Sequence, residues 1–362
     1  MRQPVKLVES FNDGHGNLSI KVEATDDIGI SSVVLEKTSG PGTVTTPTMV
    51  PWPSSGPNIY VGTIRDVPPN AQITWRATAT DTSNQKATVD QTGRVTFSSA
   101  FGSWCPATCL AGNPVNTATG NDTDTNIDLA IPGPGDSAII IDRNYNSQDE
   151  RDGPFGRGTS FMYDMQLTVH DNLLLQGVQV RYPDGHTANF RQNGAGFDPV
   201  SPGNFDRVER SGSNYILRLK DRSSFIFDVN GRLIETRTRN DVPIKLFYNS
   251  AGKLERIEDQ TTRGIKLTWV GNHITQIDAP ENKTLRYTYS GARLTSFTDG
   301  RNGLPTTFQH DGADRITAVI TPNGYPRLRQ ELDERGRVKW QLLAHESASI
   351  SATTMPPERP RS

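Results

Sequence analysis

Apolar and polar residues alternate along most of the chain, in short runs that are separated by Gly, Asn, Asp and Pro. A period of two places apolar side chains on one face of a β-strand, and the residues at the breaks favour turns. The alternation is clear in "ITWRATAT" (residues 73–80) and again in "YNSAGKLERIEDQTTRGIKLTW" (residues 248–269). This pattern predicts an all-β protein of short strands and tight turns.

The first 98 residues show the spacing of strands and turns that is typical of a β-sandwich. The predicted strands are residues 18–25, 31–37, 58–64, 71–80 and 87–97. A strand that ends in Ala24-Thr25-Asp26, with Gly29 just after it and "YVGTI" and "ITWRATATD" further on, resembles bacterial immunoglobulin-like modules of surface proteins. That resemblance implies an immunoglobulin-like β-sandwich that acts as a spacer or an adhesive unit.

The second half of the chain repeats itself every 20 to 22 residues. A period in this range is typical of repeat arrays, whose single hairpins are marginal in water and must add side by side into a sheet. The residues that we expect to point inward after each turn form an inward column: Leu233, Leu254, Ile274, Leu294, Ile316 and Val338. The residues before each turn form an aromatic column: Phe227, Tyr248, Trp269, Tyr289, His310 and Leu332.

The turns between these columns share a short motif. They read "FDVNGRL", "YNSAGKL" and "LDERGRV", with an Asp or Asn that opens the turn and a glycine three residues later. We expect Gly231, Gly252 and Gly336 to adopt the left-handed conformation that disfavours other residues. The turn at Gly291 is one residue shorter, and in "HDGADRI" the glycine, Gly312, has moved.

The motif Tyr/Phe-Asp/Asn-x-x-Gly-Arg/Lys-Leu at this spacing resembles the YD repeat of rearrangement-hotspot (Rhs) proteins. The preceding segments "GNPVNTATGNDTDTNIDLAIPGPG" (112–135), "RNYNSQ" (143–148) and "GPFGRGTSFMYDMQL" (153–167) resemble the region that leads into those repeats. Thr159 stands where the family often has Trp, which affects only the packing of that loop. The resemblance covers roughly residues 112–343.

The resemblance implies a long, curled antiparallel sheet that forms part of a shell around a C-terminal toxin cargo, or a surface protein. About six repeats are too few to complete such a shell. We expect five parts: an immunoglobulin-like β-sandwich (1–98), a linker (99–111), the Rhs entry region, here called the proximal region (112–226), the YD repeats (227–343) and a disordered tail (344–362). Partners would be other protein chains or the toxin cargo, and the location the cell surface or the medium.

The charge and the hydropathy of the chain exclude several classes of function. The chain has 38 basic and 40 acidic residues, well mixed, which argues against binding of nucleic acid. Its mean hydropathy is -0.57, the start "MRQPVKLVES" has no apolar signal core, and no apolar run is long enough to span a membrane. Cys105 and Cys109 could form a local disulfide, remain as two thiols or, with poor spacing, bind a metal.

One acidic segment could bind calcium. Asp122, Asp124, Asn126 and Asp128 occupy every second position and would face one side of a strand. A straight strand spaces them too widely to surround one ion. The alternative is a strand whose acidic face meets water while Thr125, Ile127 and Leu129 point inward.

Two further sets of side chains could bind a ligand. Tyr248, Trp269 and Tyr289 could form a platform for stacking sugars, or they could pack between hairpins. The residues that follow successive turns form a basic ladder that could bind glycan or phosphate, or protect a sheet edge from aggregation: Arg232, Lys253, His273, Arg293, Arg315 and Arg337.

Catalytic motifs are missing from the sequence. Neither H-E-x-x-H nor G-x-S-x-G occurs, and the six histidines are scattered. We therefore predict a noncatalytic structural Rhs/YD-repeat protein without a cofactor, part of a bacterial toxin-delivery or competition system. The alternative is an adhesin or carbohydrate-binding module with glycan partners, and a hydrolase or self-cleaving protease is the third hypothesis.

Overall fold

The computed structural model describes residues 5–68, 71–95, 98, 110–111, 114–117, 119–300, 303–344 and 350–351. It divides into two compact units. Unit 1 contains residues 1–99, 168–180 and 187–204, and unit 2 contains residues 100–167, 181–186 and 205–362. Cys105, Cys109, most of the predicted linker and most of the predicted tail lie outside the described residues. In the part of the chain that is described, no helix is long and apolar enough to cross a membrane.

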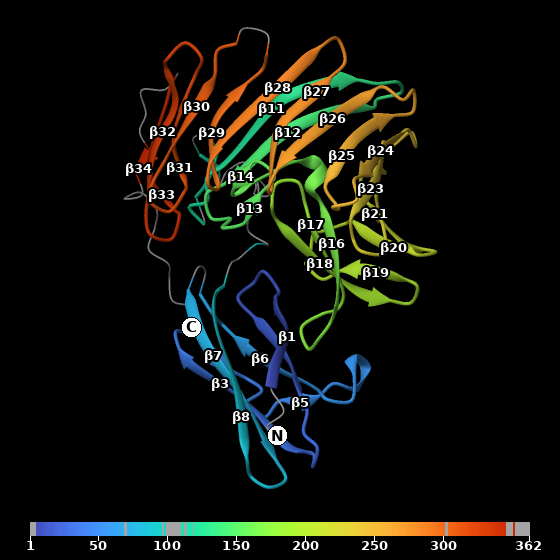
Figure 1. Cartoon of the computed structure of the whole chain (residues 1–362), viewed down its shortest axis with the longest axis vertical. Coiled ribbons are helices and arrows are strands. Elements are labelled where there is room, and N and C mark those ends of the chain that lie inside the picture. Colours follow the sequence, from blue (N-terminus) through green and yellow to red (C-terminus); the bar gives the residue numbers. More distant parts are fainter. Residues whose placement is uncertain are drawn as a thin grey trace. The chain divides into compact units, whose positions relative to one another are not determined.

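The first ninety-odd residues of unit 1 form two sheets (Figure 1). One sheet contains β1 (Val5–Asn12), β2 (Leu18–Ala24), β4 (Thr43–Val44), β5 (Val50–Pro51) and β6 (Ile59–Arg65). The other contains β3 (Ile30–Ser39), β7 (Gln72–Asp81) and β8 (Lys86–Arg94), and a 3-10 helix, η1, covers Pro53–Ser55. The five strands predicted for this segment are present. Strand β1, which the sequence analysis did not predict, adds to the edge of β2.

The two sheets share one hydrophobic core, as a β-sandwich requires. Ile20 and Val22 come from the first sheet, and Leu35, Trp75 and Ala77 come from the second. All five are at most 3% exposed. Alternate positions on β7 are buried and solvated, so the period-two pattern of "ITWRATAT" places Ile73, Trp75, Ala77 and Ala79 inward.

Strands β16 to β34 follow one another in chain order in one sheet of 19 strands. The first six are β16 (Gln166–Asp171), β17 (Gln176–Arg181), β18 (Thr187–Asn193), β19 (Gly196–Pro199), β20 (Arg207–Ser211) and β21 (Asn214–Arg218). The repeats supply β22 (Ser224–Phe227), β23 (Leu233–Arg237), β24 (Pro243–Tyr248), β25 (Leu254–Asp259), β26 (Gly264–Val270), β27 (His273–Ala279), β28 (Lys283–Ser290) and β29 (Arg293–Thr298). The last are β30 (Thr306–His310), β31 (Ile316–Ile320), β32 (Pro326–Leu332), β33 (Val338–Leu343) and β34 (Ile350–Ser351). The predicted all-β class and long antiparallel sheet are confirmed.

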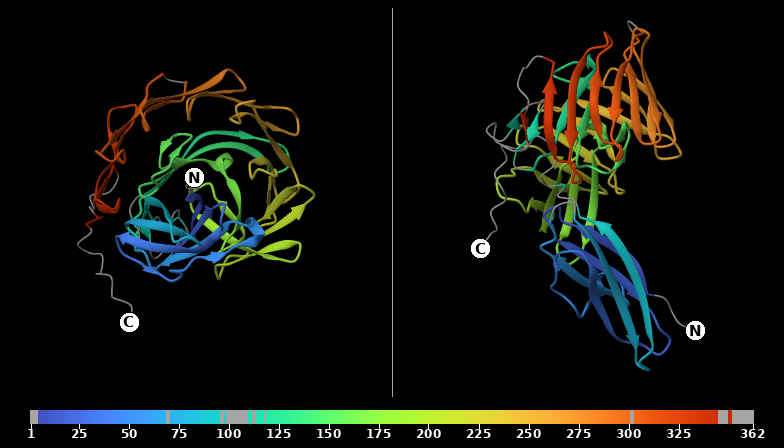
Figure 2. Two further views of the ribbon diagram at one scale, coloured as in Figure 1. Left: turned by 60° about the horizontal axis from the view of Figure 1, so that its bottom comes forward. Right: turned by 90° about the vertical axis from the view of Figure 1, so that its left-hand side faces the viewer.

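The repeat strands of unit 2 run in an arc, and two long strands of the proximal region lie inside it (Figure 2). These are β11 (Thr123–Pro132) and β12 (Ala138–Asn146), which pair with each other. The short elements around them are β9 (Leu110–Ala111), β10 (Val115–Asn116), β13 (Asp152–Gly153), β14 (Gly156–Arg157), β15 (Thr159–Ser160) and the 3-10 helix η4 (Met162–Asp164). The concave face of the sheet is therefore occupied by protein.

The inward column points to this concave side as predicted. Its six members are between 0% and 7% exposed. In each repeat the strand pairing shifts by one residue beside the aromatic column, for example between Phe247 and Tyr248, where the partner passes from Arg256 to Leu254. Such a shift is a β-bulge, which bends and twists the strand. A bulge in every hairpin accounts for the curvature of the sheet.

The Asp of the turn motif acts as a clamp on its own turn. The Asp228 carboxylate accepts hydrogen bonds from the backbone N–H of Asn230 (2.9 Å) and of Arg232 (3.0 Å), and from the Arg232 guanidinium (2.7 Å). Asp311 and Asp333 repeat the arrangement. In "DVNGR", "DERGR" and the variant "DGADR", one carboxylate thus accepts from three donors.

These hydrogen bonds also fix the charge of the clamp. Partial burial opposes ionisation of Asp228, but the hydrogen bonds from Arg232 outweigh it, so the pKa of Asp228 lies below its usual value. The pKa values of Asp311 and Asp333 are lowered in the same way. The clamps are therefore ionised at neutral and mildly acidic pH.

The turn at residues 259–263 uses the same clamp without a glycine. Asp259 accepts from the N–H groups of Thr261 (2.8 Å) and Arg263 (3.1 Å), and Thr262 has a φ of 61° where the other turns have Gly231 or Gly252. A β-branched residue is strained there. In the turn that follows Asp311, the left-handed residue is Asp314 and not Gly312.

We expect a Thr262→Gly variant to be more stable than the wild type by about 0.5–1 kcal/mol, because removal of Cβ relieves the left-handed strain by more than glycine costs in chain entropy. The measurement is guanidinium chloride unfolding. A Gln260→Gly variant in the same turn is the control and should be less stable than the wild type. Equal or lower stability of the Thr262→Gly variant would contradict this account of the turn.

Candidate functional site

The predicted aromatic platform binds the sheet through its polar atoms. The Tyr248 hydroxyl donates to the carbonyl of Leu233 (2.6 Å). Trp269 Nε1 donates in the same way to Leu254 (2.6 Å), and the Tyr289 hydroxyl to Ile274 (2.7 Å). Each acceptor belongs to the inward column and lies 15 residues earlier. The three side chains are half-buried, so each fastens one repeat to the one before it.

The basic ladder covers one face of these rings. The Arg232 guanidinium lies 5.1 Å from the centre of the Tyr248 ring, and Lys253 Nζ lies 5.0 Å from that of Trp269. The His273 ring stacks on Tyr289 at 4.5 Å, with the two planes 16° apart. Cations over aromatic faces attract through the ring quadrupole. The two predicted sets of ligand residues are therefore one interleaved stack of turn residue and ring.

An open pocket of about 380 Å³, here called the Leu254 pocket, lies beside this stack in unit 2. The sheet contributes Arg232, Tyr248, Lys253, Leu254 and Trp269, and the opposite wall comes from residues 151–154, 161 and 163–166 together with Arg181. Tyr248 and Trp269 thus line one pocket, and ligand binding by these side chains stays a prediction. Tyr289 does not line it.

The opposite wall carries a cluster of charges that the sequence analysis missed. The guanidinium groups of Arg151 and Arg181 both donate to one oxygen of Asp164, at 2.9 and 2.8 Å. Burial opposes the ionised form of Asp164, but the two arginines outweigh it, and its pKa lies below the usual value. No spacing in the sequence could have revealed the cluster, because its members lie on separate turns and strands that only the fold brings together.

The acidic segment 122–128 faces the sheet and not water. Asp122 is fully buried and accepts from the side-chain amides of Gln330 (2.8 Å) and Gln341 (3.3 Å). Asp124 pairs with Arg327 at 2.5 Å. Ile127, expected to point inward, is 65% exposed. The expected orientation of this strand was therefore wrong for Thr125, which is exposed, for Ile127 and for the acidic residues, although Leu129 is buried as expected.

The acidic residues face inward because their partners lie on distant parts of the sheet. Asp128 lies on the same face as Asp122 and Asp124, and the pairing of β11 with β12 shifts between Ile127 and Leu129, so Leu129 turns to that face as well. There Asp128 forms an ion pair with Arg143, at 2.5 and 2.9 Å, and accepts from the Tyr287 hydroxyl at 2.9 Å. The side chains of Asp128 and Arg143 are 2% and 6% exposed.

The same geometry bears on the predicted calcium site. Asn126 donates to Asp124 at 2.8 Å, while Asp122 and Asp128 have their own partners on the sheet. Within the described part of the chain, no group of three or more His, Cys, Asp and Glu is arranged to hold a metal ion. Calcium binding by Asp122, Asp124, Asn126 and Asp128 stays a prediction.

Asp122 should make the stability of the protein depend on pH. Burial raises its pKa to about 7. The hydrogen bond from Gln330 opposes this rise in pKa, and the negative charge of Asp124 adds to it. Between about pH 4, where an unfolded Asp loses its proton, and pH 7, the folded state binds one proton more than the unfolded state. The free energy of unfolding therefore falls as pH rises, by up to about 1.4 kcal/mol per pH unit.

An Asp122→Asn variant should lose this slope. The measurement is guanidinium chloride unfolding of both proteins at pH 5, 6 and 7. The difference between the two pH profiles does not depend on the turn clamps, because these are ionised in both the folded and the unfolded state over this range. It does not depend on the histidines either, because both proteins share them. Parallel pH profiles for the two proteins would contradict the assignment.

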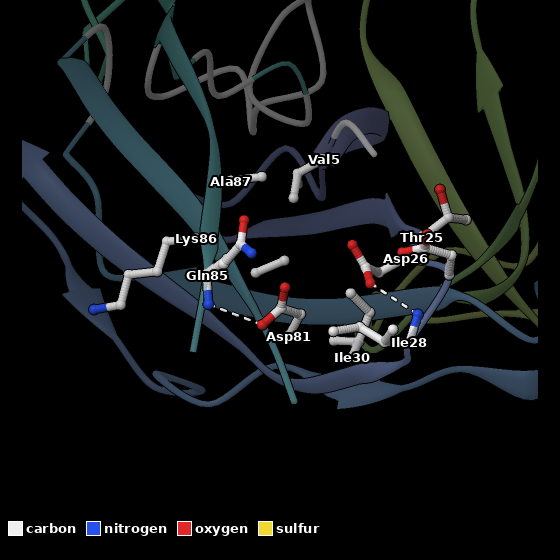
Figure 3. Close-up of a pocket in the computed structure, with 11 residues that line it drawn as sticks. Val5, Thr25, Asp26, Ile28, Ile30, Asp81, Gln85, Lys86 and Ala87 are labelled. Atoms are coloured by element: carbon white, nitrogen blue, oxygen red, sulfur yellow. Dashed lines mark hydrogen bonds between the residues drawn. The ribbon is translucent and has the colours of Figure 1, made fainter. Parts of the chain in front are cut away.

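Unit 1 has a smaller pocket of about 100 Å³ (Figure 3). Its lining includes Asp26 and Asp81, whose carboxylates accept from the backbone N–H groups of Ile28 (3.0 Å) and Gln85 (2.8 Å). Both carboxylates thus stabilise their own turns. The Leu254 pocket is the stronger candidate for ligand binding because it is larger and is lined by aromatic rings and by more cationic than acidic side chains.

Two family models match parts of the chain. Residues 112–190 match the family described as "Domain of unknown function (DUF6531)", and residues 290–326 match the family described as "RHS Repeat". The chain carries an RHS repeat. The matched RHS repeat runs from the end of β28 to the start of β32, and the same inward column and bulges continue before and after it.

Several solved structures resemble the chain at low similarity. An uncharacterized protein of Listeria monocytogenes is 12% identical over 80% of this chain and 21% of its own, with a TM-score of 0.18. A cycloalternan-forming enzyme from the same organism, in complex with a pentasaccharide substrate, is 11% identical over 78% of this chain and 21% of its own, with a TM-score of 0.18. A structure of TcdB2-TccC3 is 12% identical over 96% of this chain and 20% of its own, with a TM-score of 0.25. The RHS-repeat chain spans about a fifth of the length of these structures. A search of curated proteins gives no match.

Proposed function

We propose that this chain is a noncatalytic scaffold whose RHS-repeat sheet holds polypeptide against its concave face. The observation that carries the proposal is the way in which β11 and β12 lie inside the arc. The Tyr145 hydroxyl accepts a hydrogen bond from the N–H of Ile316 (3.0 Å), and the Arg143 guanidinium lies 5.1 and 5.2 Å from the ring centres of Phe297 and Phe308. A sheet with aromatic, apolar and polar groups on its concave side is suited to enclosing other segments.

The setting of this scaffold would be a secreted or surface-displayed bacterial system for toxin delivery or competition, with a toxin or other protein chains as cargo. The RHS repeat and the resemblance of residues 112–343 to Rhs proteins support this setting. The β-sandwich of unit 1 would be an immunoglobulin-like spacer, which its two sheets and common core support.

Co-culture tests this setting. A producing strain without the coding region should lose its advantage over a sensitive neighbour, and the intact gene should restore it. Fractionation of the producing strain should find the protein on the surface or in the medium. An unchanged advantage in the deletion strain would contradict a competition role.

The Leu254 pocket favours a second candidate, an adhesin or carbohydrate-binding module. Its rings and cations are suited to an acidic sugar, although one face of Tyr248 and one face of Trp269 are already covered. Loss of adhesion to a glycan surface, together with an unchanged competitive advantage in the deletion strain, would favour this candidate. Release of products from polysaccharide or peptide by the purified chain would contradict the noncatalytic role.

A further inference from the structure

Three backbone N–H groups of the inward column donate to acceptors outside their own hairpins. The N–H of Ile274 donates to the carbonyl of Pro154 (2.9 Å), and the N–H of Val338 donates to the carbonyl of Gly120 (3.0 Å). The N–H of Ile316 donates to the Tyr145 hydroxyl (3.0 Å). At three repeats, therefore, a polypeptide segment that crosses the turn edge of the sheet supplies an acceptor to the residue of the bulge.

Leu254 stands at the same position of its repeat. It follows the turn, belongs to the bulge beside Tyr248, is 5% exposed, and its carbonyl is taken by Trp269 just as that of Ile274 is taken by Tyr289. Where the repeats of Ile274, Ile316 and Val338 have a crossing segment, Leu254 lines the open Leu254 pocket. A buried backbone donor needs an acceptor, so the position is suited to a carbonyl from outside.

The charges that line the Leu254 pocket are unequal. Arg151, Arg181, Arg232 and Lys253 oppose Asp152 and Asp164. Asp164 is shared by two arginines, and Arg232 is paired with Asp228 of its own turn. Among the described residues no carboxylate lies within ion-pair distance of Lys253, whose ammonium lies 3.1 Å from the amide oxygen of Asn272 and over the Trp269 ring.

We propose that the Leu254 pocket binds an acidic polypeptide segment, with a backbone carbonyl on the Leu254 N–H and a carboxylate on Lys253. Polypeptide is favoured over sugar because polypeptide occupies the equivalent place at Ile274, Ile316 and Val338. Acidic side chains are favoured because the cations of the pocket exceed its carboxylates, and a partly desolvated ammonium binds a carboxylate more strongly than an exposed one does.

This inference deepens the proposed scaffold function, since it identifies one place where the scaffold contacts a partner or cargo. Its test measures binding by the purified chain and involves no competing cells. A failure of the binding test would leave the co-culture result intact, and the reverse also holds.

The test uses fluorescence anisotropy with a labelled peptide, GSEPEG, and with GSQPQG as the uncharged control. We expect GSEPEG to bind at least ten times more tightly than GSQPQG, and its affinity to fall as salt is raised. Lys253→Gln should weaken binding of GSEPEG at least tenfold. Lys266→Gln, on an exposed residue of β26 that does not line the pocket, should leave binding unchanged.

A second variant separates binding from folding. Asn272→Asp places a carboxylate beside Lys253 and neutralises it without removing a packed side chain, so binding should weaken tenfold while the melting temperature stays the same or rises. Undiminished binding in a folded Asn272→Asp variant would overturn the proposal. So would equal affinity for the two peptides, no binding of GSEPEG at millimolar concentration, or tighter binding of an oligoglucuronate, which would assign the pocket to an acidic glycan.

Discussion

An Asp128→Ala variant is expected to be less stable than the wild type by about 3–5 kcal/mol. The substitution leaves the Arg143 guanidinium buried between the Phe297 and Phe308 rings without its carboxylate. Burial alone would lower the pKa of Arg143, but Asp128 outweighs that effect and holds it above the usual value. The Tyr287 hydroxyl also loses its acceptor. The loss of stability arises because the Arg143 guanidinium and the Tyr287 hydroxyl stay buried without a partner, and not because the ion pair itself contributes that much free energy.

Guanidinium chloride unfolding, followed by near-ultraviolet circular dichroism, measures this effect. The exposed pair of Glu209 and Arg218, with both side chains 51% exposed, is the control, and Glu209→Ala should change the free energy of unfolding by less than about 1 kcal/mol. A double variant, Asp128→Leu with Arg143→Met, should recover much of the loss because no charge stays buried. Similar effects of Asp128→Ala and Glu209→Ala would refute the buried ion pair.

A Gly231→Ala variant is expected to be destabilised much more than a Gly252→Ala variant. The two glycines occupy the same place in equivalent turns, with φ values of 76° and 74°. A Cβ at Gly231 would lie 1.7 Å from the carbonyl oxygen of Leu167, whereas nothing lies within 4 Å of a Cβ at Gly252. The Gly252→Ala variant should therefore lose only about 1–2 kcal/mol from left-handed strain. The Gly231→Ala variant must also separate two backbones, which also breaks the hydrogen bond from the Leu167 N–H to the Gly231 carbonyl.

Thermal unfolding of the two variants side by side is the measurement. The melting temperature should fall clearly further for Gly231→Ala, and Gly252→Val should resemble Gly252→Ala with a larger strain because Val is β-branched. Equal melting temperatures for Gly231→Ala and Gly252→Ala would show that the two turns meet the same surroundings.

The repeat sheet could be predicted because its rules are local. A hairpin pairs residues that are close in sequence, so period-two alternation and the Asp-x-x-Gly turn were sufficient to place Leu233, Leu254 and Ile274 inward. The packing role of Tyr248 follows from the same regularity, since its acceptor lies 15 residues earlier.

The surroundings of the acidic segment could not be predicted because its partners are distant in sequence. Asp122 meets Gln330 across 208 residues, and Asp124 meets Arg327 across 203. Nothing near Asp122 in the sequence distinguishes a carboxylate that faces water from one that will find amide donors on β32. The bulge at Asp128 then turns Leu129 inward, although Ile127 before it is exposed. The Leu254 pocket is unpredictable for the same reason, since Arg181 and Asp164 reach it from separate strands and loops.

The order in which the chain is synthesised gives these long separations a kinetic consequence. The strands β16–β34 can pair as each one emerges, because every strand neighbours the next in sequence. Asp122 emerges early but meets Gln341 only 219 residues later. At roughly 5–20 residues per second, β11 waits on the order of 10–40 s on the ribosome with its acidic residues still hydrated. The last repeats thus determine when the hairpin at the centre of the arc can close, and a chain that stops before β32 would leave Asp122 and Asp124 without their partners.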